Sequence, residues 1–161
     1  MIAVYKKFFL MFGGNNMMKI LTLSFLVFLI FCKQGLSNDK FISLNNYLKN
    51  VGSETYVFKR CSGLYQTLLS YGGDRLNKET IKSYKTGSML FFKISFSIDI
   101  KNKLGDSDYV SKLNTEQIVS IAKIYRKRMD DNYLREGQAL GNDKLIKDDV
   151  IICREILSQL K

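Results

Sequence analysis

The sequence predicts an all-α protein: a four-helix bundle-like domain clamped by one disulfide and preceded by an N-terminal signal or hydrophobic helix. Three observations predict this class. Apolar residues recur at intervals of three and four along several long segments, which places them on one face of a helix. Proline is absent from all 161 residues, so no pyrrolidine ring interrupts a helix. Only one segment alternates like a strand, and a strand needs a partner.

Residues 1–37 have the features of an export signal. Residues 20–32 form an apolar run of 13 residues, which is shorter than the roughly 20 residues of a membrane-spanning helix and fits the core of a signal peptide. Lys19 precedes the run, and Gly35 and Ser37 are small residues where signal peptidase requires them. We therefore predict cleavage after Ser37 and a protein that works in the periplasm or outside the cell.

Two alternatives stay open for this leader. Translation that started at Met17 or Met18 would still give a complete signal peptide. Residues 4–12 are also fairly apolar, so an uncleaved N-terminal membrane anchor is the rival interpretation. In both cases residues 38–161 form a single helical domain, because no repeat, low-complexity tract or linker divides them.

The cysteine count predicts the clamp. Removal of the leader discards Cys32 and leaves two cysteines, and an even count in an exported chain indicates a disulfide. Each of the two lies in an apolar stripe at helical spacing: Val57, Cys61, Leu64, Leu68 and Tyr71, and Ile146, Val150, Cys153, Leu157 and Leu160. Because both stripes should face one core, we predict a Cys61–Cys153 bond that closes a loop of about 90 residues.

The first two elements are a short helix or loose arm over residues 39–50 and a helix over residues 54–71. Ser53 offers an N-cap for this second element, and Gly72-Gly73 is typical of a helix end. The polar stretch that follows should form a turn.

The next element is ambiguous. Between Phe92 and Ile100 apolar and polar residues alternate, as in a strand. Phe92, Phe96, Ile100 and Leu104 also recur every four residues, and no other segment alternates to supply a partner strand. We therefore predict a helix over residues 78–103, rather apolar and central in the fold.

Two helices complete the domain after a polar connection at residues 105–108. The first should begin at Asn114 or Thr115, because Asn114 with Gln117 resembles a capping box, and should extend to about residue 136. The second should cover residues 143–160. Residues 132–143 then connect these helices, although Tyr133, Arg135 and Gln138 are also suitable for a recognition loop.

The absence of histidine removes most enzyme chemistry from consideration. It excludes Ser-His-Asp and Cys-His nucleophilic sites and nearly all zinc patterns, and the sequence has no glycine-rich phosphate loop. We therefore predict no catalytic residue, no metal site and no cofactor.

Acidic residues are the remaining route to catalysis. A cell-wall glycosidase needs two facing carboxylates, and the candidates are Glu54, Glu79, Glu116 and Glu136. The first three lie in predicted first turns, where an acid stabilises the helix dipole. The Asp130-Asp131 and Asp148-Asp149 pairs are interpreted as solvated surface, because neighbours on a helix point about 100° apart.

Charge suggests a possible anionic-partner surface. The net charge of +10 falls to about +6 after the leader, with 21 basic and 15 acidic residues, which attracts anionic surfaces weakly. The densest basic run comprises Lys123, Arg126, Lys127 and Arg128. A solvated helix face, partly neutralised by Asp130 and Asp131, is the alternative.

The layout resembles small bacterial envelope proteins in which two cysteines clamp a helical bundle, among them acid-activated periplasmic chaperones. The resemblance is one of architecture and carries no function. We expect a non-enzymatic interaction or stress-related module whose partner is a protein or an anionic envelope component, with no nucleic acid and with membrane contact only through an uncleaved N-terminal segment. A cell-wall-acting hydrolase or its inhibitor, and a membrane-anchored accessory protein, are the alternatives.

Overall fold

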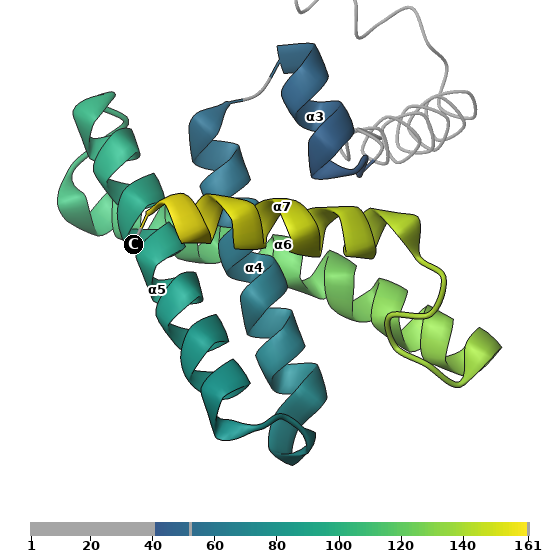
Figure 1. The fold of residues 1–161 in the computed structure, drawn as a ribbon. Coiled ribbons are helices and arrows are strands. Elements are labelled where there is room, and N and C mark those ends of the chain that lie inside the picture. Colours follow the sequence, from purple (N-terminus) through teal and green to yellow (C-terminus); the bar gives the residue numbers. More distant parts are fainter. Residues whose placement is uncertain (1–40, 52, 161) are drawn as a thin grey trace, which may run out of the picture. The chain divides into compact units, whose positions relative to one another are not determined.

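The computed structural model describes residues 41–51 and 53–160, and Figure 1 shows how their helices are arranged. These residues form five α-helices and no strand: α3 (Leu44–Val51), α4 (Glu54–Gly72), α5 (Lys78–Lys101), α6 (Ser107–Glu136) and α7 (Lys144–Gln159), with the short 3-10 helix η2 (Gly73–Arg75) after α4. The predicted all-α class is confirmed. The predicted signal segment, residues 1–37, lies outside the described residues, and none of the described helices is long and apolar enough to cross a membrane.

The helix α4 is the centre of the fold. Eleven of its 19 residues are buried, compared with five of 24 in α5. It packs against α5 and α6 along its length and is joined to α7 by the disulfide. The prediction of a central helix at residues 78–103 is therefore wrong, although the helix itself is confirmed.

The buried face of α5 explains this difference. It consists of Gly87, Ser88, Phe91, Ser95 and Asp99, so mainly small and polar side chains face α4. The Ser88 carbonyl accepts a hydrogen bond from the hydroxyl of Ser62, 3.0 Å away on α4. Small residues let two helices approach closely. Phe91 is buried among them, whereas the other large apolar side chains of α5 lie on its partly exposed flanks.

A similarly close approach joins α4 to α6 at Gly63. A Cβ atom on this glycine would lie 3.0 Å from the Ile118 carbonyl oxygen and 2.9 Å from the Ile121 side chain. Four residues further along, the Thr67 hydroxyl lies 3.1 Å from the carbonyl oxygen of Ala122 and donates to it. The two helices are thus held in contact over more than a turn.

The helix α6 begins at Ser107, seven or eight residues before the predicted start at Asn114 or Thr115. Asp106 is its N-cap, and its carboxylate accepts a hydrogen bond from the Tyr109 N–H at 2.8 Å. The predicted cap, Asn114, is buried inside the helix, and its amide donates to Asp99 at 2.8 Å. Part of the predicted polar connection is therefore helical.

The last helix, α7, crosses in front of α4 and α5 in Figure 1. Of the two residues before the helix that could cap it, Asn142 and Asp143, it is Asp143 that does so, accepting a hydrogen bond from the Ile146 N–H at 3.2 Å. Ile146, Cys153 and Leu157 from its predicted apolar stripe are buried, whereas Leu160 is 41% exposed. This stripe packs over α3 and α4 and closes the core.

Candidate functional site

The predicted disulfide is present and joins α4 to α7. The Cα atoms of Cys61 and Cys153 are 5.4 Å apart, and the bond spans 92 residues of sequence. Both cysteines are fully buried. A buried disulfide of this kind is inert towards exchange, so its role is to hold the two helices together.

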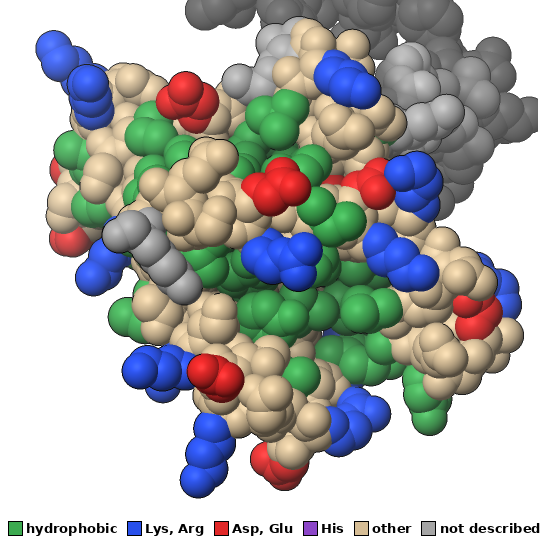
Figure 2. All heavy atoms as spheres, in the orientation of Figure 1, with side chains coloured by type: hydrophobic (Ala, Val, Ile, Leu, Met, Phe, Trp, Pro, Cys, Tyr) green, Lys and Arg blue, Asp and Glu red, His purple; other side chains and the backbone are tan. Residues whose placement is uncertain are grey.

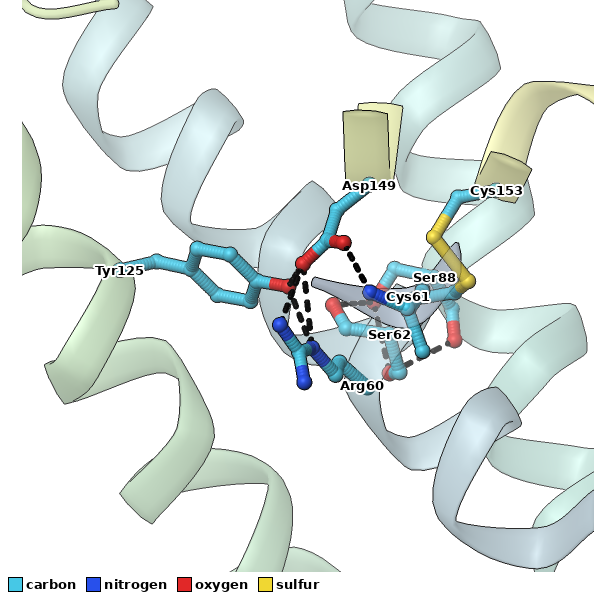
Figure 3. Close-up of a disulfide and its surroundings, with 8 residues drawn as sticks. Arg60, Cys61, Ser62, Ser88, Tyr125, Asp149 and Cys153 are labelled. Carbon is cyan, nitrogen blue, oxygen red and sulfur yellow. Dashed lines mark hydrogen bonds and ion pairs between the residues drawn. A yellow bond between two sulfur atoms is a disulfide. The ribbon is translucent and has the colours of Figure 1, made fainter. Parts of the chain in front are cut away.

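A buried ionic cluster lies one residue from Cys61 and four residues from Cys153 (Figure 3). Arg60 and Asp149 are 1% and 0% exposed, and two nitrogens of the Arg60 guanidinium donate to one carboxylate oxygen of Asp149 at 2.6 and 3.1 Å. The Tyr125 hydroxyl donates to the same oxygen. The other oxygen accepts the Leu44 N–H at 2.6 Å. The Asp149 carboxylate therefore connects α3, α4, α6 and α7.

Burial has the largest effect on the pKa values of Tyr125 and Asp149. It raises the pKa of Tyr125 well above its usual range, so the phenol stays protonated and donates. It also raises the pKa of Asp149, against the opposing effect of the Arg60 charge. Although burial lowers the pKa of Arg60, its interactions with Tyr125 and Asp149 outweigh burial and raise it. Among the described residues no buried side-chain nitrogen or oxygen lacks a hydrogen bond, so the cluster has no unsatisfied group for a substrate and is structural.

The sequence interpretation missed this cluster. The Asp148-Asp149 pair was interpreted as solvated surface, and Arg60 was not a predicted site residue. The structure buries Lys59, Arg60 and Asp149 and leaves Asp148 partly exposed. The signal was present in the spacing, because Asp149 lies three residues after Ile146 and four before Cys153, on the predicted apolar face.

A second buried cluster joins α4, α5 and α6. The Lys59 ammonium donates to Asp99 and to Gln117, each at 2.6 Å. Asn114 donates to the same Asp99 oxygen at 2.8 Å and accepts the Ser95 hydroxyl at 2.9 Å. These groups satisfy one another, so this cluster also fixes the helices and has no free ligand group.

The predicted anionic-partner surface lies on α6 and comprises Lys123, Arg126, Lys127 and Arg128. Three of its four cations make ion pairs: Arg126 with Asp130 at 3.3 Å, Lys127 with Asp131 at 2.7 Å, and Arg128 with Asp143 at 2.8 Å. Neighbouring carboxylates therefore offset most of its charge. The role of this surface in partner binding stays a prediction.

The predicted hydrolase would need two carboxylates with different pKa values in a cleft. A polar recess of about 390 Å³ lies where α6 ends and α7 begins, and its lining includes Glu136 and Asp143. The N–H of Asn142 and the Arg135 guanidinium lower the pKa of Glu136. Burial raises the pKa of Asp143, but hydrogen bonds from Arg128, Ile146 and Asn132 outweigh this effect and lower it.

Neither Glu136 nor Asp143 therefore has the raised carboxyl pKa that a general acid requires. The other candidate acids do not line this recess. Glu54 and Glu79 lie in first helical turns as predicted, and Glu116 is exposed within α6. No group of three or more metal-ligating side chains that could hold an ion occurs within residues 41–51 and 53–160.

An apolar groove opens between α4 and α6, and Figure 2 shows apolar side chains gathered there, below α7. Its volume is about 320 Å³. We call it the tyrosine groove, and its walls are Leu68, Tyr71, Leu76, Tyr84, Met129 and Tyr133. The connection from Gly137 to Leu140 forms one end.

Two residues of the predicted recognition loop belong to this groove. Tyr133 and Gln138 line it, whereas Arg135 lines the polar recess. Tyr133 is on the last turns of α6 and is 52% exposed, and Leu140 is 42% exposed. Arg75 is the one charged residue among the described residues of the lining, which include no acid. The groove is thus apolar with a single cation.

Comparison of the chain with protein-family models, with curated proteins and with solved structures found no match.

Proposed function

We propose that this protein is an exported, non-enzymatic interaction module whose tyrosine groove binds an apolar segment of a partner protein. The composition of the groove supports this proposal, because its lining includes three tyrosines, a methionine and an arginine. Tyrosine, methionine and arginine are the residue types enriched in protein–protein interfaces. The four-helix bundle-like domain, in this proposal, is the scaffold that presents them.

The lining also indicates what kind of segment would bind. With a volume of about 320 Å³, the groove is at the small end of the range of ligand pockets and would accept a few side chains. Its only charge is positive. A matching segment would therefore be apolar and would carry one carboxylate, either an acidic side chain or a free C-terminus, for Arg75 to contact.

The walls of the groove are fixed in advance by hydrogen bonds. The Tyr71 hydroxyl lies 3.5 Å from the Met129 carbonyl oxygen and joins the α4 wall to the α6 wall. The Asn132 amide donates to the Ala139 carbonyl oxygen at 3.1 Å and holds the connection at the end of the groove. A preformed site loses less conformational entropy on binding, which supports recognition rather than a passive surface.

Peptide selection tests the proposed groove. We expect a random peptide library screened on the intact, oxidised protein to yield apolar sequences with one acidic residue. Tyr133→Arg should weaken their binding at least about tenfold, because replacing a tyrosine that acts as an interface hot spot costs about 2 kcal/mol or more. Tyr109→Arg is the matched control: Tyr109 is also on α6 and is 55% exposed, but lies outside the groove.

Arg75→Glu supplies the second arm of this experiment. The reversed charge should shift the selected peptides from acidic to basic residues while keeping their apolar positions. If no peptide is enriched, or if Tyr133→Arg and Tyr109→Arg have equal effects, the groove does not bind partners.

Export is tested by the intact mass of the protein recovered outside the cytoplasm. We expect a chain that begins at Asn38 and is lighter by two hydrogens than the reduced sequence, because cleavage would follow Ser37 and one disulfide would form. Reduction should restore the two hydrogens. A recovered chain that keeps residues 1–37 would favour the anchored alternative.

A further inference from the structure

A row of lysines follows the outward face of α5. The residues at positions 78, 82, 85, 89 and 93 are separated by four, three, four and four, so they share one face of the helix. They are Lys78, Lys82, Lys85, Met89 and Lys93, and all five are exposed. We call this row the lysine stripe. Figure 2 shows basic side chains projecting from the molecule along the lower half of α5, where the stripe begins.

The lysine stripe differs from the basic surface on α6. No hydrogen bond or ion pair joins Lys78, Lys82, Lys85 or Lys93 to another described residue, whereas three of the four α6 cations are paired. Asp99 is on the same helix but is buried against Lys59. Glu79 is exposed beside Lys78 and three residues before Lys82, but it makes no ion pair with either lysine. The stripe therefore has four lysines to one exposed carboxylate, and its remaining positive charge is available to an external anion.

The same face of α5 also carries apolar side chains. Met89 is 54% exposed between the lysines, and Leu104, just beyond the helix, is 51% exposed. Phe96 and Ile100 continue the line of the stripe and are half-buried. From Lys78 to Leu104 the face would extend roughly 35–40 Å at the helical rise of 1.5 Å per residue. Positive and apolar groups thus share one long, straight surface.

We propose that α5 docks this protein onto an anionic lipid bilayer, with the helix parallel to the membrane plane. The four lysines would contact lipid phosphates, and Met89 and Leu104 would enter the boundary between headgroups and acyl chains. The long lysine stems would lie along the apolar layer while their ammonium groups stay in the headgroup region. This surface is separate from the tyrosine groove and its occupation leaves the groove proposal unaffected.

Charge complementarity and apolar exposure together select this partner. A phosphate-bearing polymer would attract the lysines but would have no apolar layer for Met89 and Leu104. An anionic bilayer offers both within one flat surface. Each lysine near such a surface strengthens binding about fivefold, and the apolar contacts add to this.

A single tryptophan gives a direct test, because the chain contains none. We expect the emission of a Met89→Trp full-length protein to shift to shorter wavelength on vesicles of phosphatidylcholine that contain phosphatidylglycerol, and less on pure phosphatidylcholine. Ile151→Trp is the matched control, because Ile151 is 45% exposed on α7. Its emission should stay unchanged on both vesicles.

Charge removal tests the lysines themselves. The variant with Lys82, Lys85 and Lys93 replaced by glutamine should bind the anionic vesicles about a hundredfold more weakly, at about fivefold for each lysine. The control replaces Lys49, Lys112 and Lys147, which are exposed on α3, α6 and α7 and belong to neither the lysine stripe nor the basic surface on α6. It has the same net charge and the same residues 1–37, so any binding by the N-terminal segment affects both variants equally.

Three results would overturn the proposal. Equal losses in the two triple variants would mean that net charge alone attracts the membrane. A shift at Ile151→Trp but not at Met89→Trp would place another face on the lipid. Binding of wild-type protein to a soluble polyanion with no shift of Met89→Trp on vesicles would assign the stripe to a polymer instead.

Discussion

Replacement of Asp149 with alanine is expected to lower the free energy of unfolding by about 3–5 kcal/mol, the cost of removing one partner from a buried ion pair. The Asp149 carboxylate is fully buried and contacts Arg60, Tyr125 and the Leu44 N–H. Its loss would leave the Arg60 charge in the core without that carboxylate. Urea unfolding followed by circular dichroism measures the effect.

The neighbouring acid is the matched control. Asp148 is one residue earlier on α7 and pairs with Lys144, whose side chain is 84% exposed. Asp148→Ala should cost less than about 1 kcal/mol, because solvent screens an exposed pair. Equal losses from the two alanine variants would show that burial does not distinguish these adjacent aspartates.

A double variant separates the ion pair from the space it occupies. Arg60→Met combined with Asp149→Leu removes both charges and keeps apolar volume in the core. Because an apolar replacement of a buried pair is often neutral or stabilising, the double variant should be more stable than Asp149→Ala. The two single variants for comparison are Arg60→Met and Asp149→Leu. If the double variant loses as much unfolding free energy as these two single variants together, the two residues are not coupled.

The helices were the most predictable part of this fold. Three helices begin or end within about two residues of the predicted positions, because glycines, the Asp143 cap and the 3.6-residue period are local signals. The disulfide followed from two apolar stripes that each contain a cysteine. None of these predictions requires knowledge of how the helices pack.

The start of α6 shows where local signals fail. Both Asp106 and Asn114 have the side chain of an N-cap. Only the structure assigns the cap to Asp106, because Asn114 finds its partners, Asp99 and Ser95, on a different helix. A tertiary hydrogen bond thus overrides an equally good local pattern.

The prediction that α5 is the central helix was wrong for a related reason. Its composition is apolar, which predicted a central position. Apart from Phe91, the side of α5 that packs on α4 consists of small and polar residues, and the lysine stripe lies on the exposed side of the helix. Mean hydropathy does not report which face of a helix is buried, and the tyrosine groove likewise depends on three helices meeting.

Loss of the disulfide is expected to have an effect of similar size to loss of Asp149. The bond spans 92 residues, for which the chain-entropy model gives about 4–5 kcal/mol. We expect the Cys61→Ala, Cys153→Ala double variant to lose about 2–5 kcal/mol of unfolding free energy, because native-state relaxation usually reduces the ideal value. Reduction of the wild-type protein should give the same midpoint.

The disulfide and the Asp149 ion pair both hold α7, so removing either of them should destabilise the same part of the fold. With the disulfide removed, the polar contacts that hold α7 to α4 are those of Asp149, and α3 is tied to the same carboxylate by the Leu44 N–H. Because α3 and α7 then have fewer links to the fold than α4, α5 and α6 have to one another, their amides should exchange faster in the disulfide-free variant. Adding Asp149→Ala to the disulfide-free variant should release α7 from the fold. The combined loss would be most of the free energy of unfolding of a typical domain, which is roughly 5–15 kcal/mol. Uniform exchange across all five helices would mean instead that the disulfide stabilises the fold only as a whole.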